Sequence, residues 1–163
     1  MDYVPHDDRL IFRQRETWLD GDEIRAQDTY TAFTSEVDAD IYLAALTTAP
    51  FVRPETFDLA LSKVQSGAYD SAFAAQKLQT FAWYQGKPLN YDPALIPRTQ
   101  DIDPVYVETS GFFAFRRELW MEHKRRIGFH PYICLVDDVE AVDIDTKEDY
   151  DFARRLMGEN ISR

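Results

Sequence analysis

Residues 41–56 read Ile-Tyr-Leu-Ala-Ala-Leu-Thr-Thr-Ala-Pro-Phe-Val-Arg-Pro-Glu-Thr, which predicts a strand, a loop and the start of a helix. The run from Ile41 to Leu46 is continuously apolar, as is typical of a central strand buried on both faces. Pro54 favours the first turn of a helix, where its missing N–H is tolerated. Ligand crevices of open α/β sheets lie beyond the carboxyl ends of their strands. The loop between strand and helix, which contains Thr48, is therefore a candidate site.

The rest of the sequence continues this alternation between strand and helix patterns and predicts an α/β fold. Further strands are expected at residues 10–12, 70–76, 105–115 and 131–136, and helices at residues 22–37, 54–67, 117–125 and 146–157. The 105–115 strand is interrupted by Thr109-Ser110-Gly111, where glycine allows a close approach of the backbone. With 163 residues and 45% hydrophobic side chains, residues 1–163 most simply form one domain.

Residues 78–104 differ from this pattern because they are aromatic, broken by glycine and proline, and poor in helical periodicity. Gln85-Gly86 is expected to turn a hairpin. Aromatic side chains gather there: Phe81, Trp83, Tyr84 and Tyr91. The segment is consistent with a lid, a sugar-stacking surface or a subunit interface, and equally with aromatics packed in the domain's own core.

Residues 142–150, Val-Asp-Ile-Asp-Thr-Lys-Glu-Asp-Tyr, carry two carboxylates directly before a helix capped by Thr146. In an extended segment Asp143 and Asp145 leave the same face, while Val142 and Ile144 point into a core. Such oxygen ligands suit Mg²⁺, which prefers carboxylates combined with substrate phosphates. An equally good interpretation is that the aspartates only end a strand and favour the positive N-terminus of the next helix.

The composition excludes several classes of function. A net charge of −11 argues against a nucleic-acid surface, because phosphate backbones are bound by clustered Lys and Arg. Cys134 is the single cysteine, so no disulfide forms within the chain, and the three histidines show no zinc-type spacing. Neither a secretory signal nor an apolar run long enough to span a membrane is apparent, so a cytoplasmic protein without membrane attachment is expected.

The sequence contains an ordered set of motifs: Thr48-Ala49-Pro50-Phe51-Val52-Arg53-Pro54-Glu55-Thr56, Tyr69-Asp70-Ser71, Ile96-Pro97-Arg98-Thr99-Gln100-Asp101, Glu108-Thr109-Ser110-Gly111 and Asp143-Ile144-Asp145-Thr146-Lys147-Glu148-Asp149. From about residue 10 to residue 157, this ordered set resembles the acylneuraminate cytidylyltransferase family, the CMP-sialic acid synthetases. The resemblance implies a Rossmann-like nucleotidyltransferase sheet of the nucleotide-diphospho-sugar transferase type, flanked by helices. It also implies that residues 78–104 form a hairpin insertion through which the protein dimerises.

The activity that the resemblance implies is transfer of CMP from CTP to an acidic nonulosonic sugar, with Mg²⁺ as cofactor and pyrophosphate as product. Asp143 and Asp145 match the family's metal pair, and Arg98 matches an arginine near the sugar carboxylate, for which a guanidinium is well shaped. The substrate-binding residues expected from the matched motifs are Thr48, Arg98, Gln100, Ser110 and Gly111. Ser110-Gly111 stands where the family has Asn-Gly.

The sequence also departs from the family. The glycine- and basic-rich loop that cradles the CTP phosphates, of the pattern Ala-Arg-x-Gly-Ser-Lys, has no counterpart in residues 1–163, so an incomplete enzyme is expected. Leu46 replaces a substrate-binding glutamine, and Ala114 replaces a tyrosine. Two other functions stay open: a non-catalytic dimerisation or binding module of the same family, and a metal-dependent glycosyltransferase in which Asp143 and Asp145 form an Asp-x-Asp motif.

Overall fold

A computed structural model of the chain describes residues 7–158. The chain falls into two compact units, Met1–Asp38 and Ala39–Arg163. The first unit contains the short helix η1 (Thr17–Asp20) and the helix α1 (Ala26–Glu36), at whose start the backbone N–H of Arg25 donates to Asp28 at 2.8 Å. The strand predicted at residues 10–12 is wrong. These residues have no regular structure and their side chains are more than half exposed, since no strand of the described residues pairs with them. The prediction of one domain over residues 1–163 stays a prediction.

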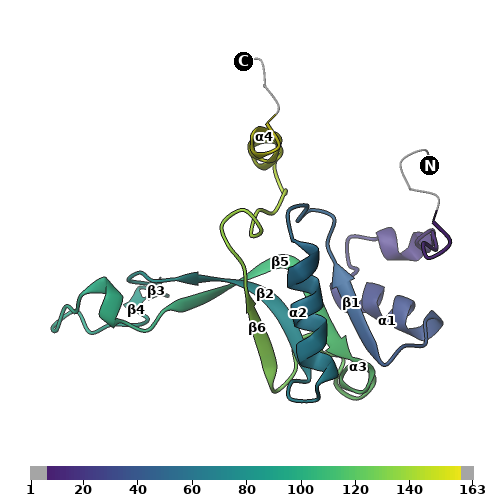
Figure 1. The fold of residues 1–163 in the computed structure, drawn as a ribbon, viewed down its shortest axis with the longest axis horizontal. Coiled ribbons are helices and arrows are strands. Elements are labelled where there is room, and N and C mark those ends of the chain that lie inside the picture. The colour runs from purple at the N-terminus through teal and green to yellow at the C-terminus, as the bar shows by residue number, and fades with distance from the viewer. Residues whose placement is uncertain (1–6, 159–163) are drawn as a thin grey trace. The chain divides into compact units, whose positions relative to one another are not determined.

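A four-stranded mixed sheet forms the centre of the second unit (Figure 1). Its strands are β1 (Ile41–Ala45), β2 (Ser71–Leu78), β5 (Val105–Arg116) and β6 (Pro131–Leu135), in the order β1-β5-β2-β6. β5 is antiparallel to both β1 and β2, and β2 is parallel to β6. β1, β2 and β6 therefore run in one direction, with β5 inserted against them.

Helices cover both faces of this sheet. α2 (Pro54–Gln65) begins with Pro54 as predicted and lies across one face (Figure 1), where the Phe57 ring is 5.2 Å from that of Phe112. Ala60 and Val64 of this helix are fully buried. On the other face, α3 (Arg117–His123) places the ring of Trp120 5.6 Å from that of Phe115. The predicted α/β fold is confirmed.

The prediction that residues 41–46 form a central strand is wrong, because within the described residues β1 pairs with β5 alone. Its apolar run has another cause. Ile41 and Leu43 pack against the core under α2, while Tyr42 on the opposite face lies 5.7 Å from Phe115. Both faces of the strand are thus covered although only one edge is paired. The central strands are β5 and β2, and residues 111–115 of β5 are all buried.

The hairpin turn predicted at Gln85-Gly86 is confirmed, while a dimerisation role for residues 78–104 stays a prediction. β3 (Trp83–Tyr84) and β4 (Lys87–Pro88) pair antiparallel around Gln85 and Gly86, whose φ angles of 49° and 75° are those of a type I′ turn. The Asn90 side chain fastens the base of the hairpin, because it accepts from the N–H of Ala82 and donates to the carbonyls of Thr80 and Asp103. The short helix η2 (Thr99–Asp101) then leads towards β5.

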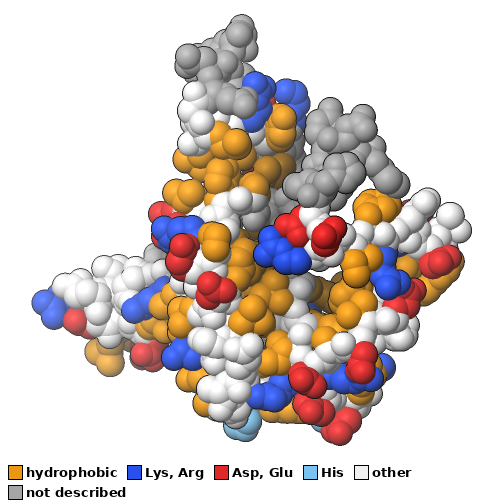
Figure 2. Space-filling model, turned by 45° about the vertical axis from the view of Figure 1, so that its right-hand side comes forward, with side chains coloured by type: hydrophobic (Ala, Val, Ile, Leu, Met, Phe, Trp, Pro, Cys, Tyr) orange, Lys and Arg blue, Asp and Glu red, His pale blue; other side chains and the backbone are white. Residues whose placement is uncertain are grey.

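The last helix, α4 (Lys147–Leu156), starts at the predicted cap: Thr146 accepts from the N–H of Asp149 at 3.2 Å, and Asp149 accepts from the N–H of Thr146 at 2.8 Å. The helical spacing of Tyr150, Ala153, Leu156 and Met157 predicts a buried stripe on this helix, and that prediction is wrong. Ala153 is buried, but Tyr150, Leu156 and Met157 are 53%, 41% and 68% exposed. Figure 2 shows hydrophobic side chains gathered on this helix at the top of the view. An amphipathic pattern indicates that a helix has a face suited to burial. In the described residues little of that face of α4 is covered.

Candidate functional site

Three of the segments predicted to bear the site meet at the carboxyl end of β1. The backbone N–H of Leu46 donates to the carbonyl of Gly111 in β5 at 3.2 Å. The N–H of Ile144, which stands between the two aspartates, donates to the carbonyl of Thr48 at 2.9 Å. The loop after β1 therefore contacts both the interrupted stretch of β5 and the acidic segment, as expected for a crevice beyond a strand end.

The interruption in β5 is a large bulge. Phe73 of β2 faces Phe113, and Ala75 faces Glu108, so Thr109 to Phe112 are opposite the single residue Ala74. Bulges of this kind re-aim side chains next to functional sites. A Cβ on Gly111 would lie 3.0 Å from Cγ2 of Val52 and 3.4 Å from Cβ of Ala74. The predicted close approach at this glycine is confirmed, and the approaching chain is the loop after β1.

Asp143 and Asp145 lie in different environments. The Asp143 side chain is half-buried, and its Oδ1 atom is inaccessible to solvent without a hydrogen-bond partner. Asp145 is exposed, and its backbone N–H donates to Asp149 Oδ2 at 3.3 Å. A buried carboxylate oxygen without a partner is costly unless it meets a cation or donor. This orphaned oxygen fits a bound cation.

Within residues 7–158 no group of three or more His, Cys, Asp and Glu side chains is placed to hold a metal ion. Mg²⁺ does not require such a group, because it is usually bound by one or two carboxylates together with substrate phosphates and water. Asp143 and Asp145 are thus sufficient in chemistry and number for a metal that arrives with a triphosphate.

Glu140 is a buried residue of this region that sequence reasoning missed. Its side chain is 3% exposed and accepts hydrogen bonds from the Arg53 N–H at 3.0 Å, the Arg53 guanidinium at 2.5 Å and the Thr56 hydroxyl at 2.6 Å. Burial raises the pKa of the Glu140 carboxyl, but the hydrogen bonds from Arg53 and Thr56 outweigh it and hold the pKa below its usual value. Arg53 also pairs with the exposed Asp137 at 2.7 Å.

Arg98 and Gln100 lie apart from the three segments that meet at β1. Gln100 is in η2, Arg98 directly precedes it, and both are exposed. The Arg98 guanidinium forms a two-pronged pair with Asp101, through Nε at 2.7 Å and a terminal nitrogen at 3.1 Å. A sugar carboxylate would therefore have to replace Asp101 at Arg98. The planar grip expected of Arg98 is present in the structure, but its partner is a carboxylate of the same chain.

The Tyr69-Asp70-Ser71 motif has a structural role that the sequence did not predict. Asp70 accepts from the N–H groups of Phe129 and His130 at 2.6 and 3.0 Å, and Ser71 donates to Asp70 at 2.8 Å. The Ser71 hydroxyl in turn accepts from the N–H of Gly128 at 2.8 Å. Burial raises the pKa of Asp70, but these hydrogen bonds outweigh it and lower the pKa. The motif fixes the turn that leads into β6.

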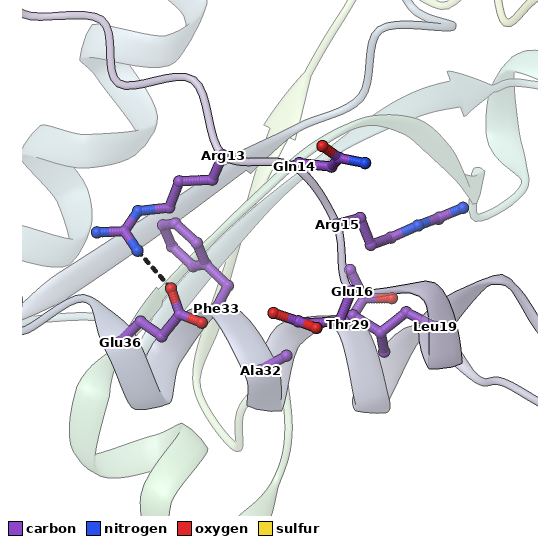
Figure 3. A pocket seen from close by; sticks show the side chains of 9 residues that line it. All are labelled: Arg13, Gln14, Arg15, Glu16, Leu19, Thr29, Ala32, Phe33 and Glu36. Atoms are coloured by element: carbon purple, nitrogen blue, oxygen red, sulfur yellow. Dashed lines mark hydrogen bonds and ion pairs between the residues drawn. The ribbon is translucent and has the colours of Figure 1, made fainter.

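The first unit has a hollow of its own, of about 200 Å³ (Figure 3). Its walls come from residues 13–16 and from α1, and Arg13 pairs with Glu36 at one end. The volume is below the roughly 300–1,000 Å³ typical of small-molecule sites. None of the residues that line it is among the predicted site residues.

Comparison with known proteins agrees with the motifs. N-acylneuraminate cytidylyltransferase A of Danio rerio is 24% identical over 145 residues, which are 83% of this chain and 34% of that protein. N-acylneuraminate cytidylyltransferase of Oncorhynchus mykiss is 27% identical over 136 residues, 78% of this chain and 31% of that protein. The chain is thus similar in sequence to the N-acylneuraminate cytidylyltransferases. The predicted resemblance is confirmed, although no family model matches the chain, and the chain spans about a third of the length of these relatives.

Solved structures of two nucleotidyltransferases share the fold. 4-Diphosphocytidyl-2C-methyl-D-erythritol synthase from Anaerococcus prevotii matches with a TM-score of 0.58 and 13% identity, over 84% of this chain and 68% of that one. CMP:2-keto-3-deoxy-manno-octonic acid synthetase, in a complex with CTP, matches with a TM-score of 0.58 and 17% identity, over 84% of this chain and 69% of that one. The predicted nucleotidyltransferase fold is therefore confirmed.

Proposed function

We propose that this chain takes part in transfer of CMP from CTP to an acidic nonulosonic sugar, with Mg²⁺ and release of pyrophosphate. The observation that carries the proposal is the contact between Thr48 and Ile144, which brings the loop after β1 beside an aspartate with an orphaned buried oxygen. The names of the relatives support the class of reaction: they are cytidylyltransferases, and one fold neighbour is a CMP-sugar synthetase complexed with CTP.

In the proposed reaction the anomeric hydroxyl of the sugar bonds to the α-phosphorus, the bond from that phosphorus to the bridging oxygen breaks, and pyrophosphate leaves. The hydroxyl proton passes to solvent. Mg²⁺ bound by Asp143 and Asp145 would offset the charge on the phosphate oxygens. Ser110, on the β5 bulge, is assigned to the sugar through its hydroxyl, and the next residue, Gly111, packs against Val52 of the loop after β1. Arg98 and Gln100 are assigned to sugar binding, and Arg98 would bind the carboxylate of the sugar.

The decisive test measures Mg²⁺-dependent CTP binding by calorimetry and pyrophosphate release from CTP with a panel of nonulosonic acids. We expect Asp143→Asn and Asp145→Asn each to abolish Mg²⁺-dependent CTP binding. Asp58→Asn is the matched control, because Asp58 is an exposed aspartate of α2 away from the acidic segment. Equal binding by wild type and Asp145→Asn would refute the metal assignment.

The assignment of Arg98 has its own test. Arg98→Lys keeps the charge but loses the two-pronged geometry, so we expect it to weaken binding of the acid sugar by more than about 1 kcal/mol, roughly fivefold in Kd. Unchanged sugar affinity would leave Arg98 as a partner of Asp101 only.

A second candidate is a dimerisation or binding module without chemistry, which the hairpin insertion favours. Trp83 and Tyr84 at its tip are 59% and 65% exposed, and Leu95 and Ile96 are about three-quarters exposed. Exposed apolar groups of this size are typical of interaction surfaces. This candidate predicts a stable dimer that neither binds Mg²⁺ with CTP nor releases pyrophosphate, and light scattering combined with the calorimetry separates it from the first.

No helix within residues 7–158 is long and apolar enough to cross a bilayer. The cytoplasmic location and the homodimer stay predictions.

A further inference from the structure

We infer that Glu140 is the positioning residue of the candidate site: its buried carboxylate fixes the loop after β1 against the acidic segment and so sets the place of Asp143 relative to Thr48. The effect of Glu140 on ligand binding rests on the proposed function. The effect of Glu140 on the position of the loop does not, because it concerns contacts within the chain.

The two segments are joined at two points. At one end, Glu140 accepts the Arg53 N–H, the Arg53 guanidinium and the Thr56 hydroxyl. At the other end, the Ile144 N–H donates to the Thr48 carbonyl. Asp143 lies between these points on one segment, and the residues from Ala49 to Val52 lie between them on the other. The distance across the candidate site is therefore held at both ends.

The segment that leads from Asp137 to Asp143 is a hydrogen-bonded turn. Asp137 Oδ1 accepts from the N–H groups of Val139 and Glu140, both at 3.0 Å. The Ala141 N–H donates to the Asp137 carbonyl at 3.0 Å, and the Val142 N–H donates to the Val139 carbonyl at 3.2 Å. This turn leads directly into Asp143, so a displacement of Glu140 is passed on to the aspartate.

Glu140 and Asp137 share Arg53 but differ in what else they do. Asp137 is half exposed, and its contact with the loop after β1 is made with the Arg53 guanidinium, at 2.7 Å. Glu140 is buried and also accepts a backbone N–H of Arg53, the residue just before α2, and the hydroxyl of Thr56 in the first turn of α2. Glu140 thus fixes the backbone of the loop, whereas Asp137 reaches only a side chain of the loop. A carboxylate at the start of a helix is further stabilised by the helix dipole.

The loop transmits this constraint to the β5 bulge. Val52, one residue before Arg53, packs against the position where Gly111 lacks a side chain, at 3.0 Å from an ideal Cβ. A loop released at Arg53 would be free to leave this contact. Glu140 therefore controls both sides of the predicted crevice, the acidic segment and the bulge that bears Ser110.

The test compares Glu140→Gln, which removes the charge and puts an amide NH₂ against the Arg53 guanidinium in place of the oxygen that accepts from it, with the matched control Asp137→Asn. We expect amide hydrogen exchange at Ile144 to quicken at least tenfold in Glu140→Gln, and to change less than twofold in Asp137→Asn. Thr56→Val, which removes one of the three hydrogen bonds, gives an intermediate rate and serves if Glu140→Gln does not fold. An unchanged Ile144 rate in Glu140→Gln, or in Thr56→Val if that variant alone folds, overturns the inference.

The second readout is the Kd for CTP with Mg²⁺. Glu140→Gln is expected to raise it at least tenfold at a temperature where the variant is fully folded, whereas a merely structural role would lower the Tm and leave the Kd unchanged. If the wild-type chain binds no CTP, the proposed function fails, and the Ile144 exchange rate still decides the positioning role. Faster exchange with an unchanged Kd would refute the link between Glu140 and the ligand.

Discussion

Gly128→Ala tests how much the turn before β6 contributes to stability. An ideal Cβ at Gly128 would lie 2.2 Å from Asp70 Oδ1, 2.3 Å from its Cγ and 2.4 Å from its Oδ2. No rotation of the methyl group relieves a contact with all three atoms, so the carboxylate must leave its place. It would then lose the N–H groups of Phe129 and His130 and the hydroxyl of Ser71.

Hydrogen bonds to a charged group contribute about 1.5–3 kcal/mol each. Since the displaced carboxylate regains water, we take the loss as that of two such bonds at the lower end of this range plus some strain, about 4 kcal/mol in the free energy of unfolding. Loss of this size is exceptional for a point substitution. Urea denaturation followed by far-UV circular dichroism measures it, provided that the slope of the transition stays constant.

Two controls separate the clash from other effects of alanine. Gly86→Ala places a Cβ that has nothing within 4 Å of it, so only the backbone strain of its positive φ, about 1 kcal/mol, is expected there, a strain that Gly128 does not share. In an Asp70→Ala background the carboxylate is already gone, so adding Gly128→Ala should cost less than about 1 kcal/mol more. A Gly128→Ala loss below about 1.5 kcal/mol, or strict additivity with Asp70→Ala, would refute the reasoning.

Three other outcomes are expected. The folded-state pKa values of Asp70 and Glu140 lie below their usual values, so both carboxylates stabilise the fold above about pH 4–5. This stability is lost as the pH falls through the folded-state pKa values. Thermal unfolding at pH 7, 5 and 3.5 checks the expectation, and an unfolding midpoint that stays constant down to pH 3.5 would contradict it. Thr146→Ala removes the cap of α4 and should weaken that helix by about 1 kcal/mol; hydrogen exchange of the α4 amides measures it, with rates equal to wild type as the contrary result. Trp83→Ser at the exposed hairpin tip should shift a dimer towards monomer in light scattering, and an unaltered mass would remove Trp83 from the predicted interface.

The parts of the fold that follow from local sequence were predictable. Pro54, the Gln85-Gly86 turn and the Thr146 cap each act through their own backbone geometry, so each marks its element correctly in the structure. The continuous run from Ile41 to Leu46 shows the limit of this reasoning. A continuous apolar run indicates that both faces of a strand are covered, but it does not indicate which edges of the strand are paired.

The candidate site shows the same division. Gly111 and the acidic pair stand out because their residue types are unusual for their positions, and the structure brings Gly111 and Ile144 to the same loop. Glu140 gives no such signal, since a single glutamate between Val139 and Ala141 is normally exposed. Its burial depends on Arg53, which is 87 residues away in the chain. The one available signal was the arginine at the end of the matched loop, which needs an acidic partner when it lies close to a core.

The insertion of β5 between β1 and β2 has a consequence for how the protein comes to be folded. β1, α2 and β2 are synthesised first, yet β1 and β2 do not pair with each other, because each waits for β5: Ile41 meets Arg116 and Ser71 meets Phe115. Pairings this distant in sequence close slowly, since the entropy of a long loop is lost before any contact is gained. A nascent chain released before Val105 therefore holds β1 and β2 without the strand that joins them. Placing β5 late in the chain leaves the edges of β1 and β2 unpaired for as long as Val105–Arg116 is still to be made, and unpaired edges favour aggregation.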